Sequence, residues 1–368
     1  MKIKHIEPIA ISLPMTKPVK MSFEEVSSAN NALVRLETDD GVVGWGEAAS
    51  APTMTGETME GMAAAIRYLA PLLAGLPADE IGAVMARCDR YLYGNPAAKS
   101  AIEMALHDAL GRATGKPVYA LLGRRLRSRV AVLRMIGTGN VDTDVEEAKR
   151  RKAEGYVAFK IKVGVAGPLE DAERTRRVCE ALGKGVLVCA DANQGWSAEQ
   201  AVTYVRAVEA SGLAFFEQPV AGDDLEGMAR VARASRVRIC CDEGLHSLDD
   251  LRRHHAAGAA HGGSLKTIKL GGMKPVYDAA LLCESLGMKV NLACKIAESG
   301  IATAAMLHLA AAVPAVDWGV SLTSQYLTDD VLKQPLRFAD GHAEVPAGPG
   351  LGIEVDEAKV RRYARNMQ

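Results

Sequence analysis

AFKIKVG (residues 158–164), GVLVCADAN (185–193), LAFFEQP (213–219) and VRICCDEG (237–244) are the segments that decide the fold of this chain. Each is a short apolar run that ends in charged or polar residues, and stretches with helical hydrophobic spacing separate them. This alternation is typical of βα units, which build a parallel sheet with helices packed on it. The middle of the chain is therefore predicted to be α/β.

The same alternation continues on both sides of these segments. Further strands are predicted at VAVLRMIG (130–137), SLKTIKLGG (264–272), KVNLACKIAE (289–298) and VDWGVSL (316–322). Helices are predicted near 143–154, 170–183, 197–210, 224–234, 247–257, 273–286 and 300–312. Strict alternation of eight strands with helices favours a closed parallel barrel over an open doubly wound sheet. The open sheet is also disfavoured because no GxGxxG motif follows the first strand.

The chain before the barrel has a different pattern, which predicts an α+β unit. Residues 2–13 alternate like a strand, and two further apolar segments flank Asp40-Gly41, a pair typical of a tight hairpin. Helices are predicted near 57–75, 79–92 and 96–113. The tail is polar and rich in glycine, and we expect it to return to the first unit. The predicted division is therefore 1–125 for the first unit, 126–328 for the barrel and 329–368 for the returning tail.

Composition excludes several classes of protein. The chain has 368 residues, 48% of them hydrophobic, so it can bury a large core. Its 44 basic and 45 acidic residues give a net charge of −1, which argues against nucleic-acid or membrane-surface binding as the main task. The seven cysteines form no CxxC pair, and we see neither a signal peptide nor an apolar run long enough to span a membrane. These features predict a cytoplasmic protein with reduced, buried cysteines.

Acidic residues follow three successive barrel strands. Asp191, Glu217 and Asp242 are spaced 26 and 25 residues apart, and each comes at the end of its strand. Because active sites of such barrels lie at the carboxyl ends of the strands, we expect these carboxylates to converge. Three hard oxygen ligands suit Mg²⁺, with Mn²⁺ as a substitute, better than zinc or copper. Asn193 follows closely and is placed to orient a metal-bound water, whereas the simpler alternative is that each acid caps the next helix.

Lysines lie on either side of these acids. Lys160 and Lys162 are two residues apart on the second strand, so they point to the same face, and Lys266 follows the sixth strand. In an eight-stranded barrel the second and sixth strands are opposite each other. A substrate bound at the metal would therefore meet an ammonium group on each face. To act as bases, the lysines would need a pKa lowered toward neutrality by burial and neighbouring cations. The alternative is a structural network of ion pairs.

These motifs make the chain resemble the enolase superfamily, in the subgroup named for muconate lactonizing enzyme. The matching pieces extend over nearly the whole chain: DGVVGWGEA, AKSAIEMALHDALGRATGKPVYALLG, FKIKVG, CADANQGW, FFEQP, CDEG and SLKTIKLGG. The two lysines of KIK and the later lysine distinguish this subgroup from the mandelate racemase branch, which has a His-Asp pair. The family spacing of 24 residues after Asp242 selects Lys266 over Lys269.

The resemblance implies a fold, a metal and roles for the lysines. It implies a modified (β/α)7β TIM barrel with an N-terminal capping domain that the C-terminal segment completes. Lys162 is implied as the base on one face and Lys266 on the other, while Lys160 helps to hold the substrate carboxylate. An enolate intermediate stabilised by Mg²⁺ is implied, and loops near 16–25 and 50–58 are expected to close over a small carboxylate substrate. We also expect a homo-oligomer.

Other polar residues near the strand ends are harder to assign. Glu243 and Glu298 are placed near the substrate, and Glu298 matches a family glutamate. Lys295 either meets a second carboxylate or faces solvent, and solvent is favoured because lone lysines are usually exposed. Trp318 either stacks on a cationic or planar substrate or packs at the barrel end. Among the histidines, His308 is expected in the core, and the pair at 254–255 on a solvated helix face.

Three functions agree with these residues. The first is a muconate-type cycloisomerase, and the second is a racemase, epimerase or dehydratase acting on an N-substituted or hydroxyproline-like amino acid. The third is a barrel that has lost catalysis and only binds ligands, which the complete set of lysines and acids disfavours. Dipeptide epimerases carry an Asp-x-Asp on the last strand where this chain reads DWGVSL, so dipeptide epimerisation is not expected. Both lysines occur throughout the subgroup, so they do not separate the first two functions.

Overall fold

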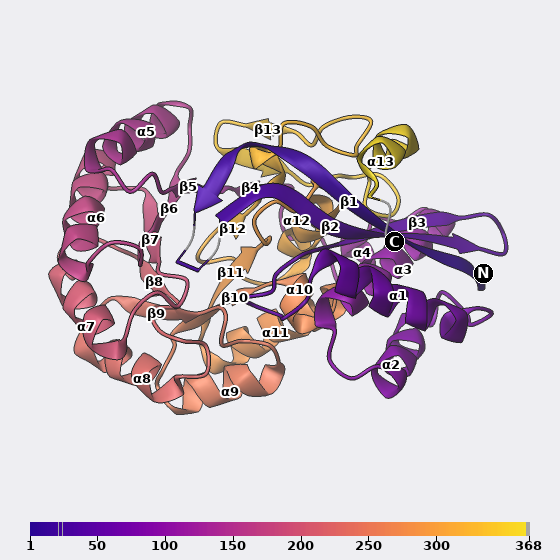
Figure 1. Ribbon diagram of the computed structural model, residues 1–368, viewed down its shortest axis with the longest axis horizontal. Coiled ribbons are helices and arrows are strands. Elements are labelled where there is room, and N and C mark those ends of the chain that lie inside the picture. The colour runs from indigo at the N-terminus through magenta and orange to yellow at the C-terminus, as the bar shows by residue number, and fades with distance from the viewer. Residues whose placement is uncertain (21, 24, 366–368) are drawn as a thin grey trace.

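The computed structural model describes residues 1–20, 22–23 and 25–365, and its largest sheet is the predicted parallel barrel (Figure 1). The eight strands are hydrogen-bonded in chain order: β5 (Leu133–Ile136), β6 (Ala158–Lys162), β7 (Leu187–Asp191), β8 (Phe215–Glu217), β9 (Arg238–Cys241), β10 (Gly262–Leu265), β11 (Lys289–Ala293) and β12 (Val320–Ser321). A parallel bridge between Val132 and Val320 joins the first and last strands and brings the barrel close to closure.

Helices surround this sheet on the outside, as Figure 1 shows for the arc from α5 to α9. They are α5 (Val141–Ala153), α6 (Pro168–Leu182), α7 (Ala198–Ala207), α8 (Leu225–Ala234), α9 (Leu248–Ala256), α11 (Met273–Leu286) and α12 (Gly300–Ala312). A short helix α10 (Thr267–Leu270) is inserted after β10, and the last strand leads into a 3₁₀ turn, η1 (Ser324–Tyr326). The (β/α)7β pattern and the predicted helices are confirmed, and so are the predicted strands with one correction. Of the predicted strand 264–272, only its first two residues are in β10, and residues 267–270 form the helix α10 instead.

The N-terminal unit is a three-stranded antiparallel sheet covered by helices. Its strands β1 (Ile3–Lys20), β2 (Glu25–Thr38) and β3 (Val43–Ala49) pair in chain order, and its helices are α1 (Met59–Leu73), α2 (Ile81–Tyr91), α3 (Pro96–Thr114) and α4 (Tyr119–Leu122). Helix α3 packs so closely on β3 that a Cβ atom on Gly46 would come within 1.9 Å of the Ala101 carbonyl oxygen. Gly44 and Gly46 of the GWGE segment therefore let helix and sheet approach closely.

The C-terminal segment contacts both parts of the molecule. Strands β13 (Phe338–Ala339) and β14 (His342–Glu344) form a small sheet with β4 (Arg129–Ala131), just before the barrel, and helix α13 (Glu357–Tyr363) follows. The Arg365 amide donates to the Ala10 carbonyl at 2.8 Å. Buried Asp108 of α3 accepts from the amides of Trp45 at 2.9 Å and Leu351 at 2.8 Å. The tail thus returns to the first unit, as expected, and also pairs with the start of the barrel.

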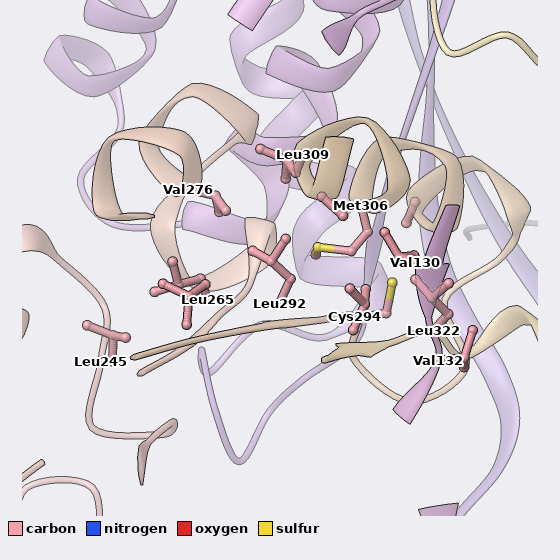
Figure 2. Packing of buried hydrophobic residues seen from close by; sticks show 14 of the residues in the cluster. Val130, Val132, Leu245, Leu265, Val276, Leu292, Cys294, Met306, Leu309 and Leu322 are labelled. Carbon is pink, nitrogen blue, oxygen red and sulfur yellow. The ribbon is translucent and has the colours of Figure 1, made fainter. Parts of the chain in front are cut away.

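The core between strands and helices is apolar and continuous. Figure 2 shows Leu265 and Leu292, from β10 and β11, facing Val276 and Leu309 of helices α11 and α12. Every residue of α12 is buried, including His308, which confirms the prediction that this histidine is a core residue. Among the residues that the structure describes, no helix has the length and apolar character needed to cross a bilayer.

Candidate active site

The three acidic residues come together at the carboxyl ends of β7, β8 and β9. The parallel register makes Asp191 and Glu217 direct neighbours, and it pairs Glu217 with Cys240, two residues before Asp242. All three carboxylates are buried, with at most 1% of each residue exposed. Parallel pairing therefore gathers acids that are about 25 residues apart in the chain into one cluster.

Lysine side chains contact each of these acids. Lys160 Nζ lies 2.6 Å from Glu217 Oε2 and 3.7 Å from Asp191 Oδ2. Lys162 Nζ donates to Asp191 Oδ2 at 2.7 Å, and Lys266 Nζ makes a short contact with Asp242 Oδ2. Lys160 and Lys162 lie on β6 and Lys266 directly follows β10, four strands away in the barrel order, so the predicted placement on opposite walls is what the structure shows.

A fourth lysine, Lys269, supports Asp242 from behind. Its side chain is buried, and Nζ lies 2.6 Å from Asp242 Oδ1 and also donates to the backbone carbonyls of Asp242 and Ser264. Lys266 lines the cavity at this end of the barrel, whereas Lys269 is absent from the described lining. The choice of Lys266 as the cavity lysine agrees with this geometry.

The charges on the two sides of the site alter each other's protonation. Burial alone would lower the pKa of Lys160, but the charges of Glu217 and Asp191 outweigh it and hold that pKa well above its usual value. Burial would also lower the pKa of Lys266, but the charge of Asp242 outweighs this effect, so the pKa of Lys266 is raised. These two pKa values are raised because each ammonium group faces carboxylates. The fall toward neutrality that is expected beside a divalent cation stays a prediction.

The acid cluster supplies oxygen donors for the cation that the sequence predicted. Neither oxygen of buried Glu217 accepts a hydrogen bond of good geometry, although the Lys160 ammonium lies 2.6 Å from Oε2. A buried carboxylate with so few hydrogen bonds fits a cation as a further partner. Within the described residues, no three acidic, histidine or cysteine side chains are yet close enough to form a metal cage. Lys160 lies between Asp191 and Glu217. The donor set suits a hard divalent cation, and holding one requires the ammonium groups to move aside.

Asn193 and Glu243 extend the polar network along the cavity wall. The Asn193 side chain accepts from Lys162 Nζ at 2.6 Å and donates to Glu243 Oε1 at 3.0 Å. Its backbone has a φ of 42°, an unusual conformation for a residue other than glycine, and its amide donates to Asp191 Oδ1. Burial, followed by the charge of Asp242, raises the pKa of Glu243 to about 7. Both residues lie where the sequence placed them, in contact with the acid and lysine cluster.

A cavity opens above these residues, between the barrel and the N-terminal unit. Its open space, counting the mouth, is about 780 Å³. Val19, Phe23, Thr53 and Met54 of the N-terminal unit line its upper part. The Met54 sulfur lies 3.8 Å from Lys266 Nζ. The stretches near 16–25 and 50–58 thus lie over the cavity as expected, although residues 21 and 24 are outside the described part of the chain.

Two family models of known proteins match this chain. The family model "Mandelate racemase / muconate lactonizing enzyme, N-terminal domain" matches residues 6–123, and "Enolase C-terminal domain-like" matches 143–359. The chain belongs to the mandelate racemase/muconate lactonizing enzyme family. This membership confirms the resemblance to the enolase superfamily that the KIK, CADAN, FFEQP and CDEG motifs indicated.

Relatives of this family match the chain over its full length. A chloromuconate cycloisomerase of Cupriavidus pinatubonensis (strain JMP 134 / LMG 1197) is 35% identical, with 96% of each chain covered. Muconate cycloisomerase 1 of Rhodococcus opacus is 33% identical, covering 100% of this chain and 99% of the relative. Among solved structures, muconate lactonizing enzyme from Pseudomonas fluorescens with muconolactone aligns at TM-score 0.95 and 31% identity, covering 99% of both chains. N-succinyl Arg/Lys racemase from Bacillus cereus ATCC 14579 aligns equally well at 30% identity, covering 100% and 99%.

Some expectations about this family member's polar residues are wrong. Lys295 does not face solvent, since it is 4% exposed and lines the cavity. For Trp318 the second of the two alternatives holds: it is buried and stacks on Phe215 inside the barrel, with 4.3 Å between ring centroids, and it is absent from the described cavity lining. His254 is 4% exposed rather than solvated, and its Nδ1 atom forms a hydrogen bond with the Asp250 carbonyl. His255 is exposed, as expected.

Glu298 lies behind the cavity wall rather than on the described lining. It is 1% exposed, and burial together with the charge of Glu47 raises its pKa to about 8, so it is largely protonated at neutral pH. Glu47 itself accepts from the amides of Ser299 and Ala302 and so caps helix α12. Glu298 is therefore near the site, as predicted, without being placed to contact a ligand directly.

Two supporting residues were missed by the sequence interpretation. Buried Gln218 accepts from the amides of Asp242 at 2.8 Å and Gly244 at 3.2 Å, and so fixes the strand end that carries the third acid. Lys269 neutralises the other side of Asp242. The available signal was that Gln218 follows Glu217 and that Lys269 lies one helical turn after Lys266. The spacing alone does not show which of the residues next to a site residue point inward.

Proposed function

We propose that this enzyme takes or gives the proton on the carbon next to a substrate carboxylate, and that its reaction is a cycloisomerisation of the muconate type. The observation that carries this proposal is the placement of Lys162 and Lys266 on opposite walls, with the three acids between them. Such an arrangement offers a proton donor or acceptor to each face of a planar intermediate. The full-length likeness to muconate and chloromuconate cycloisomerases supports the choice of reaction.

Asp191, Glu217 and Asp242 would hold the divalent cation, Mg²⁺ or Mn²⁺. When bound, the cation supplies positive charge that stabilises the negative charge developing on the substrate carboxylate. Lys160 orients that carboxylate. Lys162 and Lys266 hold and move the proton at the adjacent carbon, and the Met54 segment shields this carbon from water.

For cis,cis-muconate the proton balance is simple. One carboxylate oxygen adds to the carbon–carbon double bond and closes a five-membered lactone, while the carbon next to the other carboxylate receives one proton from a lysine. No oxidant or leaving group is needed, because substrate and product are isomers. The small-molecule substrate, the cytoplasmic location and a homo-oligomeric state remain part of this proposal.

The first experiment tests the reaction itself. We expect the Mg²⁺-loaded protein to convert cis,cis-muconate to muconolactone, with kcat/KM in the ordinary enzyme range of about 10⁴ M⁻¹s⁻¹ or above. The loss of diene absorbance gives the rate, and NMR identifies the lactone. Lys162→Met should lower kcat at least about 100-fold because it removes a proton-transfer group, while the exposed control Lys149→Met should not. Failure of the wild-type protein to form lactone would refute cycloisomerisation.

Racemisation of an N-substituted amino acid is the second candidate function. It is favoured by the complete pair of opposed lysines, since a racemase needs an acid on one face and a base on the other. The structural likeness to an N-succinyl Arg/Lys racemase supports it as well. NMR in D₂O with N-succinyl amino acids distinguishes this reaction, because a racemase replaces the α-hydrogen and yields both enantiomers.

A further inference from the structure

The wall of the cavity opposite the acid cluster carries a buried positive charge. Lys295 lies two residues beyond β11, lines the cavity and is 4% exposed. Its backbone is fixed, because its carbonyl accepts from Thr323 Oγ1 at 2.7 Å and from the Glu298 amide at 3.2 Å. Ala297, which follows closely, has a φ of 70°, so the chain turns sharply here. Lys295 therefore belongs to the cavity wall and is not extended into water.

The barrel order places this lysine directly across from the first acid. β11 is four strands away from β7, so Lys295 is opposite Asp191, just as the lysines of β6 are opposite Lys266. The line from β6 to β10 and the line from β7 to β11 therefore cross at the cavity. A substrate whose reacting carbon lies between Lys162 and Lys266, with one carboxylate at the acids, would extend its far end toward Lys295.

A second, independent observation lies on the neighbouring strand. Ser321 of β12 lines the cavity, and within the described residues its buried Oγ atom has no hydrogen-bond partner. Its strand neighbour in the ladder is Ala293, two residues before Lys295. A buried hydroxyl without a partner is costly unless something satisfies it, and a bound ligand can do so. Lys295 and Ser321 therefore lie at adjacent strand ends and line the same cavity.

We propose that Lys295 and Ser321 form a subsite for a second carboxylate, so that the enzyme selects dicarboxylates. This inference deepens the proposed function and rests on it for the position of the reacting carbon. The subsite does not decide between the two candidate reactions, because muconate and N-succinyl amino acids both carry two carboxylates. It does disfavour substrates with a single carboxylate, including the hydroxyproline-like acids considered from the sequence.

The test measures binding, which keeps it separate from turnover. Isothermal calorimetry in Mg²⁺ compares adipate, a six-carbon dicarboxylate, with hexanoate, the monocarboxylate of the same length. We expect adipate to bind the wild-type protein at least about 10-fold more tightly than hexanoate, because charge-assisted hydrogen bonds are strong. Lys295→Met should weaken adipate binding about 10- to 100-fold and leave hexanoate binding unchanged.

Three further variants sharpen the comparison. Lys295→Arg keeps the charge and should retain most of the preference, and Ser321→Ala should weaken adipate binding about 3- to 10-fold. Lys333→Met, which removes an exposed lysine from the tail, should change neither ligand. Equal affinity of the wild-type protein for the two acids, no adipate binding at millimolar concentration, or equal losses for both acids in Lys295→Met would overturn the subsite. If muconate is not converted while the adipate preference holds, the reaction assignment fails and the subsite stands.

Discussion

At the scale of single residues, the site is a compact set of buried charges in which each group has a defined neighbour. Arg174 illustrates how the surroundings hold them. It donates to the Lys162 carbonyl at 2.5 Å and pairs with Asp144 at 2.7 Å and Asp171 at 2.6 Å. Asp171 in turn accepts from the Gly164 amide. This buried network behind β6 fixes the end of the strand, and so keeps the Lys162 side chain directed at the cavity.

The prediction at this scale concerns Glu217. Glu217→Gln keeps the shape of the side chain but removes the charge, and we expect Mg²⁺ affinity to fall at least about 10-fold, because charge-assisted contacts account for much of cation binding. Calorimetry with Mg²⁺ measures the affinity, and circular dichroism checks that the variant is folded. Glu146→Gln, an exposed acid on α5, is the matched control. Unchanged affinity in Glu217→Gln would rule Glu217 out as a ligand.

At the scale of elements, the sequence is most informative where the hydrophobic pattern repeats. The strands ending at Asp191 and Glu217 were predictable because short apolar runs alternate with helical ones, and parallel strands end on the same side. The burial of Lys295 and of His254 was not predictable, since it depends on which way the chain turns after a strand or helix. Trp318 was ambiguous for the same reason, because its own sequence does not reveal the partner ring of Phe215.

Helix α12 gives a prediction about pH. Burial lowers the pKa of His308 from 6.5 to about 4, and its Nδ1 atom accepts from the Tyr119 amide at 3.3 Å. Between these two values the unfolded chain takes up a proton that the native state refuses. The stability of the native state is therefore unaffected by this histidine above pH 6.5 and falls progressively as the pH drops from 6.5 to 4, by about 2 kcal/mol at pH 5.

Urea denaturation at pH 7.5 and pH 5 measures this effect. His308→Asn cannot take up the proton, so its free energy of unfolding should decrease less between the two pH values than that of the wild-type protein. His255→Asn, at an exposed position on α9, should retain the wild-type difference. The same pH dependence in His308→Asn as in the wild-type protein would show that His308 is not held neutral by burial.

At the scale of the whole molecule, the site belongs to two units at once. The barrel supplies the acids and lysines, while the N-terminal unit covers them through Met54 and through Ser22, whose hydroxyl donates to the Ala192 carbonyl at 2.7 Å. His246 holds the Met54 carbonyl at 2.8 Å from the barrel side. The sequence predicted both units and their covering segments, but not these contacts, because they join residues that are about 170 or more positions apart and follow no local pattern.

The central claim is that Lys162 and Lys266 face the two sides of one bound carboxylate, and hydrogen exchange in D₂O tests it most directly. The Mg²⁺-loaded protein is incubated with muconolactone and with N-succinyl amino acids, and NMR and mass spectrometry follow deuterium at the carbon next to the carboxylate. We predict label in the wild-type protein, with Lys162→Ala and Lys266→Ala each losing exchange on a different face. In a cycloisomerase one lysine dominates and a single label appears, whereas in a racemase each variant still exchanges one enantiomer. Exchange that persists unchanged on both faces in both variants, or that is absent from the wild-type protein with all these acids, would contradict the account.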